Sequence, residues 1–325
     1  MDNIEIIRYS KSLHSSLFEY IKKTFPSYSD EYTSYCLDNS IDNMSEGTAF
    51  VALKNDKIVG CHMFYNTRAF INGQIVNTRW GHDTYIDEDC RKDLSIKFIV
   101  EINKIPAFGI GVSDANKKIQ ESIRTRFIKG LFTYCIPTFY STIYNLKRNK
   151  RIESFKAPYE ITTGFSKFHE VDNAKQITIL NDGYWYKDLC NVDFVRDEEF
   201  LNNRFFNNKA FNYNIYTADG LDCYFVVRPI VFHNIPSLLL VDFRYDTRNP
   251  FIIGQIIKAC KKIACENSLG SLVLLSNDNN IGNYLKKRIV LKRETNLLAN
   301  RYLKLHGDIL SNITAADADV DYMYH

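Results

Sequence analysis

Two strand meanders, each followed by a helix and a further strand, constrain the fold of this chain most. The first meander comprises TAFVALK, KIVGCHMFYN and QIVNTRWGHDTYI, separated by the turns Asn55-Asp56 and Asn72-Gly73. An Asn-Gly pair between β-branched runs is a strong hairpin signal because both turn positions of such a hairpin need positive φ. The second meander comprises NIYTA, LDCYFVVRPIVF and SLLLVDFRYD, separated by Asp219-Gly220 and by a break between His233 and Pro236. The repeated unit predicts antiparallel sheet in both halves.

Segments with helical spacing flank both meanders. Leu13, Leu17 and Ile21 precede the first one, and Pro26 ends that helix. The other elements expected in the first half are helices at 30–39, 93–104 and 116–128, the strand FGIGV, and closing strands within 131–144. The second half continues with the helix FIIGQIIKACKKIACE, the strand SLVLLS and a helix at 279–287. The first half therefore has the order β-α-α-β-β-β-α-β-α-β, which is a mixed α/β fold.

Short matches between the halves indicate a duplication. Asp83-Thr-Tyr-Ile-Asp87 ends the third strand of the first meander, and Asp242-Phe-Arg-Tyr-Asp246 ends that of the second. Val112-Ser-Asp-Ala-Asn116 and Leu275-Ser-Asn-Asp-Asn279 occupy the same later strand-to-helix junction. Since 325 residues suit two domains of about 150 residues each, we place domains at 1–150 and 151–325. The boundary falls in the weakly periodic stretch 146–175.

Composition and charge exclude several classes of protein. The net charge of +3 is too small to indicate a nucleic-acid partner, and the basic run at 147–151 is more typical of a solvated connector than of a phosphate contact. The eight cysteines include no CxxC pair, so we expect no metal. The acidic N-terminus has no signal-like apolar run, and no stretch approaches the roughly 20 apolar residues that span a bilayer. We therefore expect a cytoplasmic, soluble protein with no membrane partner.

The first meander, the helix that opens near Arg91, and the segment GVSDANKKI resemble the GNAT superfamily of acyl-CoA N-acyltransferases. The resemblance covers residues 4–143 and, more faintly, 175–305. It implies two tandem GNAT-like domains, each a mixed, mostly antiparallel sheet flanked by helices. In that fold two neighbouring strands splay apart and hold the pantetheine arm of CoA, while the amides of a helix N-terminus bind its pyrophosphate. The implied co-substrate is acyl-CoA, either acetyl-CoA or 3-hydroxybutanoyl-CoA.

The resemblance assigns an acyl-CoA site to the first half. Arg91 and Lys92 would contact the pyrophosphate, with Ser95 capping or contacting it, although the glycines usual at this place in the family are absent. The alternative is a solvent-facing helix start. The other implied cofactor-binding residues are Thr84, Tyr85 and Ile86 at the end of the strand, and Ser113 and Asn116 at the later junction, where they also suit a helix N-cap.

Amine acylation needs a neutral nucleophile, so a group must take a proton from the incoming ammonium. His82 and Asp83 lie at the end of the strand beside the expected thioester and are the candidate base; the alternative for Asp83 is a hydrogen bond to a turn. The family often carries a Tyr that protonates the leaving thiolate. Only the second half offers one at that position, Tyr284. We nevertheless prefer the first half for acyl-CoA, because Pro250 removes an amide donor from the corresponding helix start in the second half.

The second half is expected to shape the acceptor site. Arg244 presents donors that match a diphosphate, and Asp242 begins the same motif; a surface pair between Arg244 and Asp246 is the alternative. Asp317 and Asp319 lie in a run with acidic residues at alternate positions, which we interpret as a strand with one acidic face. Trp80 either stacks on a sugar or base or belongs to the core.

The leading interpretation is N-acylation of a nucleotide-linked amino sugar. Tandem GNAT chains of this size are similar to bacterial enzymes that acylate dTDP-linked 3-amino-3,6-dideoxyhexoses for O-antigen biosynthesis, and a homodimer is compatible with this interpretation. A FemABX-like aminoacyl transferase and a non-catalytic protein that binds CoA or sugar remain as alternatives.

Overall fold

The computed structural model describes residues 4–38, 48–111, 114–140, 152, 154–177, 192–306, 309 and 311–317. The chain divides into two compact units. Unit 1 comprises Met1–Ala69, Ile75–Lys129 and Asn296–Asp308, and unit 2 comprises Phe70–Gln74, Gly130–Thr295 and Ile309–His325. The predicted domain boundary at residue 150 lies outside the described residues.

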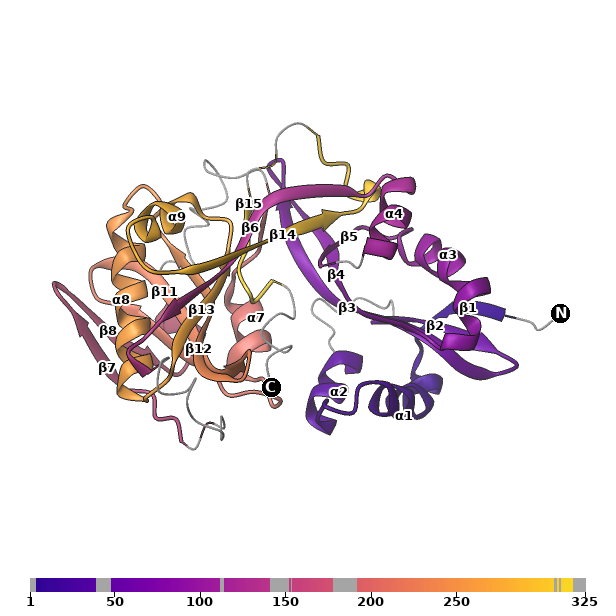
Figure 1. The fold of residues 1–325 in the computed structure, drawn as a ribbon, viewed down its shortest axis with the longest axis horizontal. Coiled ribbons are helices and arrows are strands. Elements are labelled where there is room, and N and C mark those ends of the chain that lie inside the picture. Colours follow the sequence, from indigo (N-terminus) through magenta and orange to yellow (C-terminus); the bar gives the residue numbers. More distant parts are fainter. Residues whose placement is uncertain are drawn as a thin grey trace. The chain divides into compact units, whose positions relative to one another are not determined.

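Unit 1 contains the first meander and the helices around it (Figure 1). Its strands follow the order β1-β2-β3-β4-β5-β14. The elements are β1 (Ile4–Arg8), α1 (His14–Thr24), α2 (Asp30–Asp38), β2 (Ala49–Lys54), β3 (Lys57–Ile71), β4 (Gln74–Ile86), α3 (Arg91–Ile102), β5 (Ala107–Ile110), α4 (Asp114–Ser122), the start of β6 (Arg126–Pro137) and the end of β14 (Leu291–Ala299).

Both turns of the first meander have the backbone that their sequences predict. Asn55 and Asp56 have φ of 51° and 62°, and Asn72 and Gly73 have φ of 50° and 87°. Two successive positive φ values match the right-handed twist of the flanking strands, which is why Asn, Asp and Gly occupy these positions. The hairpins are therefore confirmed, and they fix the register of β4 against β3.

The sheet of unit 1 is covered on both faces. One face packs against α3 through a cluster that includes Phe50, Phe64, Leu94 and Phe98. The neighbouring residue on β3, Tyr65, points to the opposite face, where its hydroxyl lies 3.0 Å from that of Tyr32 on α2. Side chains alternate between the two faces of a strand, so one strand contacts helices on both sides.

Unit 2 contains the second meander and one long helix that covers it (Figure 1). Its strands follow the order β6-β13-β12-β11-β10-β8-β7. Its elements are β7 (Glu160–Thr163), β8 (Ser166–Val171), β9 (Val192–Phe194), α7 (Glu198–Leu201), β10 (Asn214–Ala218), β11 (Leu221–Phe232), β12 (Ile235–Tyr245), α8 (Phe251–Glu266), β13 (Ser271–Ser276), α9 (Asn279–Leu285) and β15 (Ser311–Asn312).

Helix α8 supplies the core of unit 2 because its apolar residues recur at helical spacing. Ile253, Ile256, Cys260 and Ile263 are all fully buried, and they belong to one cluster with alternate residues of β11 and β12 such as Phe225. The predicted stripe on this helix is confirmed. Apolar residues spaced by three or four positions form one helix face, and burying that face on a sheet is the main source of helix stability in a protein.

Each sheet contains a strand from the opposite half of the sequence. In unit 1, residues 297–299 of β14 pair with β5. In unit 2, residues 132–137 of β6 pair with β13. Pairing between segments so distant in the chain leaves no local signal, and the sequence did not predict either exchange.

Several predicted elements differ from the structure. The helix expected at 116–128 ends at Ser122, because β6 begins at Arg126, and β6 is one long strand in place of the closing strands expected within 131–144. The hairpin of β7 and β8 falls in a stretch expected to be irregular. Residues 315–317 form a turn and not the predicted acidic strand. Among the described helices, none is long and apolar enough to cross a membrane.

Candidate functional site

The pairing between β4 and β5 in unit 1 stops early. These parallel strands pair only at Arg79–Ala107 and Trp80–Phe108, although β4 continues to Ile86 and β5 to Ile110. Beyond this point, among the described residues, no strand pairs with the edge of β4 that faced β5. Unpaired backbone groups at such an opening can bind an extended amide-containing ligand by strand-like hydrogen bonds.

Asp83 interrupts β4 inside this opening. Its φ of 46° is in the left-handed region, which a residue with a Cβ adopts at a cost of about 1 kcal/mol or more. A left-handed residue within a strand disturbs the regular alternation of side chains. The regular backbone of β4 is therefore interrupted at Asp83, although the strand continues to Ile86, and the Asp83 side chain keeps 15% of its surface exposed.

The Asp83 carboxylate is held at one oxygen by two donors. The Tyr28 hydroxyl donates to Oδ2 over 2.6 Å, and Nδ1 of His82 lies 2.9 Å from the same oxygen. The His82 ring stacks on Tyr65 with centroids 4.3 Å apart and planes 7° apart. Within the described part of the chain, Oδ1 has no hydrogen-bond partner, so it is the oxygen that a ligand can reach.

The electrostatics of this group favour an ionised carboxylate. Burial raises the pKa of Asp83, but the hydrogen bonds from His82 and Tyr28 and the charge of His82 together hold it below its usual value. Burial, with His82 nearby, lowers the pKa of His62 to about 3, so the His62 imidazole is neutral. A neutral imidazole and an ionised carboxylate thus lie on adjacent strands.

Sequence reasoning missed three residues of this site. His62 on β3 bonds through Nδ1 to the Thr84 hydroxyl, 2.7 Å away, and its Nε2 would lie only 2.8 Å from a Cβ at position 81, which Gly81 lacks. Tyr28 and Tyr65 come from different elements from His82 and Asp83. Only the tertiary fold brings them together. Gly81 next to His82 was the one local signal that could have indicated a close approach to this strand.

The start of α3, which was predicted to bind pyrophosphate, has three acidic residues next to its basic pair. A short 3-10 turn, Glu88–Cys90, runs directly into α3, so the helical segment begins one turn before Arg91. Arg91 donates from Nε to the Ile86 carbonyl over 2.9 Å, and its guanidinium lies 5.6 Å from the centroid of Tyr85. Arg91 and Lys92 are exposed, while Asp87, Glu88 and Asp89 precede them.

The remaining predicted residues of the first half have the following places. Ser95 bonds to the Arg91 carbonyl over 2.7 Å and lies on α3. Asn116 lies in the first turn of α4 and is half-buried, and Ser113 lies outside the described residues. Trp80 is 1% exposed and packs on Phe108, with ring centroids 5.8 Å apart. Trp80 therefore lies in the core, which is one of the two positions considered for it from the sequence.

Unit 2 has an equivalent opening that its own chain bridges. β12 and β13 pair from Ser237–Ser271 to Leu240–Leu274, and Val241 is then an extra residue in the register with β11. The Val241 carbonyl accepts a hydrogen bond from the Ala316 amide over 2.9 Å. Asn277, which follows β13, accepts one from the Ile313 amide over 2.8 Å. The segment 311–317 therefore bridges the two strands where their pairing has ended.

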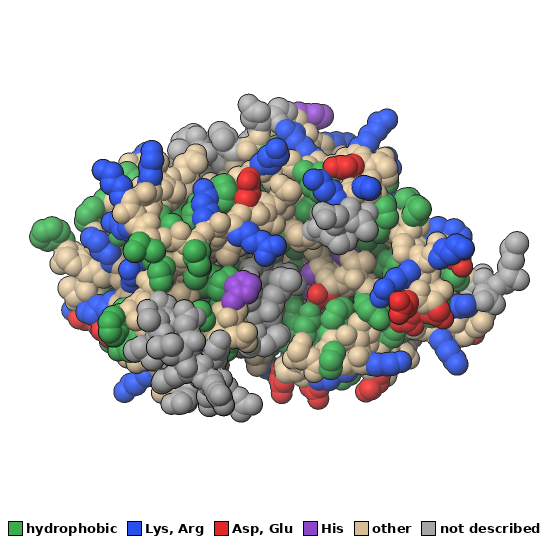
Figure 2. Space-filling model, viewed as in Figure 1, with side chains coloured by type: hydrophobic (Ala, Val, Ile, Leu, Met, Phe, Trp, Pro, Cys, Tyr) green, Lys and Arg blue, Asp and Glu red, His purple; other side chains and the backbone are tan. Residues whose placement is uncertain are grey.

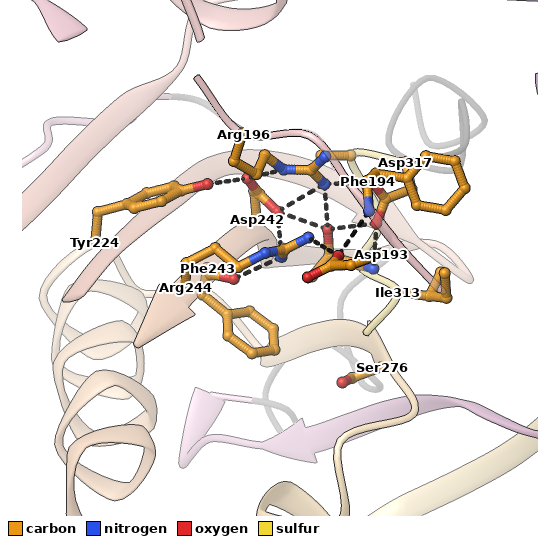
Figure 3. A network of polar contacts seen from close by, with 12 residues as sticks. Asp193, Phe194, Arg196, Tyr224, Asp242, Phe243, Arg244, Ser276, Ile313 and Asp317 are labelled. Carbon is orange, nitrogen blue, oxygen red and sulfur yellow. Dashed lines mark hydrogen bonds and ion pairs between the residues drawn. The ribbon is translucent and has the colours of Figure 1, made fainter. Parts of the chain in front are cut away.

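A buried network of charges fills the same region (Figure 3). Arg196 donates to Asp242 over 2.9 Å and 3.2 Å and also bonds to Asp317. Arg244 donates to Asp193 over 3.0 Å and lies 3.3 Å from Asp242. The side chains of all five residues are fully buried. The Thr314 hydroxyl bonds to Asp242 over 2.6 Å, which ties the segment 311–317 to the network.

The network has one more acid than base. With Asp193, Asp242 and Asp317 against Arg196 and Arg244, full ionisation would leave one excess negative charge. Burial raises the pKa of Asp193 to about 6 despite the nearby arginines, whereas Arg196 and Arg244 outweigh burial at Asp242 and hold its pKa below the usual value. Asp193 Oδ2 is buried without a hydrogen-bond partner. Asp193 is thus the residue of this network whose protonation would remove the excess charge.

This packing bears on the substrate residues predicted in the second half. Arg244 and Asp242 are ion-paired in the interior and present no exposed side-chain atoms, which differs from the expected cleft position and from the alternative surface pair. Asp317 lies in the same network, and Asp319 lies outside the described residues. Tyr284 packs its ring over Gly254, where a Cβ would come within 2.8 Å of it. The described residues contain no group of three or more His, Cys, Asp or Glu that could hold a metal.

Comparison with known proteins identifies the fold. No family model and no curated protein sequence matches the chain. Among solved structures, a probable N-acyltransferase from Enterococcus faecalis V583 is 10% identical, with a TM-score of 0.60 over 92% of this chain and 72% of the other. N-myristoyltransferase of Saccharomyces cerevisiae, solved with myristoyl-CoA, is 12% identical, with a TM-score of 0.61 over 98% of this chain and 84% of the other.

A GCN5-related N-acetyltransferase from Anabaena variabilis ATCC 29413 is also similar. It is 12% identical, with a TM-score of 0.58 over 91% of this chain and 72% of the other. At these identities the likeness concerns the fold. The expected mixed α/β architecture with two tandem GNAT-like domains is therefore confirmed.

Proposed function

We propose that this protein is an acyl-CoA-dependent N-acyltransferase that holds its acyl-CoA in unit 1, in the opening between β4 and β5. The observation that carries the proposal is the early end of β4–β5 pairing next to Asp83, whose carboxylate is ionised and accessible at one oxygen. Similar folds in N-acyltransferases support the same activity, and the myristoyl-CoA bound by the yeast enzyme supports acyl-CoA as the co-substrate.

The contrast with unit 2 supports this choice of half. In unit 2 the corresponding edge of β12 already bonds to the segment 311–317, through the Val241 carbonyl, and the charges behind it are paired with each other. A pantetheine arm would have to displace these bonds. In unit 1, no segment of the described residues bridges β4 and β5 beyond Trp80–Phe108 in this way.

The chemistry follows from the positions of Asp83 and His82. The acceptor ammonium donates a hydrogen bond to Oδ1 of Asp83 and gives one proton to the Asp83–His82 pair. The free lone pair of the amine attacks the thioester carbonyl carbon, the carbon–sulfur bond breaks, and the CoA thiolate leaves and takes up a proton. Asp83 contributes charge stabilisation of the ammonium, and its hydrogen bond orients the His82 ring.

The acceptor that we propose is a nucleotide-linked amino sugar, with acetyl or 3-hydroxybutanoyl as the acyl group. The support is the resemblance of the sequence to tandem transferases of that class. An acidic group with aromatic neighbours also suits a cationic amine: the Asp83 carboxylate accepts a hydrogen bond from the Tyr28 hydroxyl. Aromatic faces and carboxylates both stabilise an ammonium.

Two measurements test the proposal in sequence. The thermal shift of the whole protein is measured with CoA, acetyl-CoA, 3-hydroxybutanoyl-CoA and longer acyl-CoAs; we expect a rise in Tm with at least one thioester, because a ligand that binds only the folded state stabilises it. Release of free CoA thiol is then followed with dTDP- and UDP-linked amino sugars. Absence of any shift would contradict acyl-CoA binding, and turnover with other amines only would replace the acceptor.

A further inference from the structure

The connection between α9 and β14 in unit 2 combines exposed apolar residues with a basic run. Residues 286–293 have the sequence KKRIVLKR, in which five Lys and Arg surround three apolar residues. The side chains of Ile289 and Leu291 are among the most exposed large apolar groups described, at 84% and 71%. We call these eight residues the basic–apolar segment. Exposed apolar side chains that lie together among charged ones mark an interaction surface, whereas single exposed ones need no explanation.

The segment is held in a fixed conformation. Val290, between the two exposed residues, packs against the core cluster of unit 2. The guanidinium of Arg288 lies 3.7 Å from the centroid of the Tyr284 ring, and Nζ of Lys292 lies 3.4 Å from that of Phe132. Val290 packs inward, whereas the residues on either side of it are exposed. The fold therefore presents Ile289 and Leu291 together to the solvent.

The charges of the segment are available to a partner. Within the described part of the chain, Lys286, Lys287 and Arg293 are exposed and form no ion pair. The carboxylate that follows them, Glu294, accepts a hydrogen bond from the Gly130 amide over 2.9 Å and is occupied by the backbone. Figure 2 shows Lys and Arg side chains over α9 and β14 on the face in view. The exposed apolar pair is thus framed by positive charge.

We propose that the basic–apolar segment docks this protein on the surface of an anionic lipid bilayer. The cations would approach the negatively charged headgroups, and Ile289 and Leu291 would enter the boundary between headgroups and acyl chains. An RNA backbone would use the same cations but would leave both apolar side chains in water, so a lipid surface accounts for more of the segment. Docking of this kind needs no spanning helix.

The test is co-sedimentation of the whole protein with vesicles. Vesicles of phosphatidylcholine alone are compared with vesicles that contain about one-third phosphatidylserine, at low and at physiological salt. We expect binding to the anionic vesicles only, weakening as salt screens the charges. Ile289→Ser with Leu291→Ser should weaken the partition at least tenfold, and so should Lys286→Glu with Lys287→Glu.

Matched control variants distinguish binding by this segment from nonspecific hydrophobic adsorption and from an effect of net charge. Phe165→Ser with Ile75→Ser removes two other exposed apolar side chains, and Lys97→Glu with Lys118→Glu reverses two other exposed cations; both pairs should bind within twofold of the parent. All variants change exposed residues, so an unchanged Tm is expected and is measured. The proposal is overturned by absence of anionic-vesicle binding, by equal binding to neutral vesicles, or by binding that survives the apolar double substitution. Tighter binding to single-stranded RNA that ignores Ile289 and Leu291 would also overturn it.

Discussion

The two units use the opening beyond their paired parallel strands in opposite ways. In unit 1, β4 and β5 separate after Trp80–Phe108, and the carboxylate of Asp83 keeps one oxygen accessible. In unit 2, β12 and β13 separate after Leu240–Leu274, and the first residue of the matching motif, Asp242, is fully buried in an ion network. The same motif in the same place thus yields an accessible acid in one unit and a structural one in the other.

The difference teaches that the surroundings of a motif set its role. Asp83 is bonded by an uncharged hydroxyl and by His82. Asp242 is bonded by Arg196, Tyr224 and Thr314, and it lies beside Arg244. A carboxylate surrounded by fixed donors in the interior stabilises structure only as long as every partner remains, because a buried charge without its partner is strongly unfavourable. Four predictions test this comparison.

The largest effect is expected at Asp83. Asp83→Asn should lower kcat about 10²- to 10⁴-fold, because the amide can neither hold the ammonium nor accept its proton; His82→Ala should lower it less. The measurement is CoA release with the best acyl-CoA and acceptor. Asp87→Asn is the matched control, since Asp87 also ends this strand region and also binds a tyrosine, Tyr20. If Asp83→Asn lowers kcat less than threefold, Asp83 has a structural role, as Asp242 does.

The second-largest effect is expected on the free energy of unfolding, when Arg244 is replaced. Arg244→Ala should lower the free energy of unfolding by about 3–5 kcal/mol, because it leaves Asp193 without its ion-pair partner in the interior. Arg248→Ala is the control: its side chain is 65% exposed and pairs with Asp246, so its effect should stay within about 0.5 kcal/mol. Denaturant titration measures both. A stable Arg244→Ala variant with a raised KM for the acceptor would instead support the sequence-based assignment of Arg244 to the substrate.

A pH-dependent effect is expected at Asp193. The pKa of this acid is raised to about 6 in the folded protein, above the roughly 3.9 of an unfolded chain. The folded state therefore binds the proton more tightly, and the contribution of Asp193 to stability falls as pH rises from about 4 to 6. Asp193→Asn keeps an acceptor for Arg244 and removes the excess charge, so its Tm relative to the parent should rise through this window and level off above it. A difference that does not change with pH would contradict the assignment.

The smallest effect is expected at the start of α3. Arg91→Ala with Lys92→Ala should raise the KM for acyl-CoA about tenfold, because two charge-assisted contacts to phosphate would be lost. Lys97→Ala on the same helix is the control and should leave KM unchanged. The acids at 87–89 oppose an anion here, so an unaltered KM would mean that backbone amides alone bind the pyrophosphate in unit 1.

Much of the fold could be predicted from the sequence because its signals are local. The turn Asn72-Gly73 fixes a hairpin within four residues, and the spacing of Ile253, Ile256 and Ile263 fixes the buried face of α8. The candidate site was predicted in part: His82 and Asp83 lie together at the opening in unit 1. The contributions of Tyr28, His62 and Tyr65 were not predicted, because each comes from another element and has no motif of its own.

The sequence by itself determined the element order of the first half, the repeated meander and the position of Asp83 and Asp242 toward the ends of the third meander strands. Only the tertiary structure determined which of the two carboxylates is accessible and which is ion-paired in the interior. Arg196 reaches Asp242 from 46 residues away and Thr314 from 72 residues away along the chain, whereas among the described residues no arginine donates a hydrogen bond to Asp83. Turn and helix signals act over a few residues, but the burial and pairing of a charge depend on every segment that packs around it.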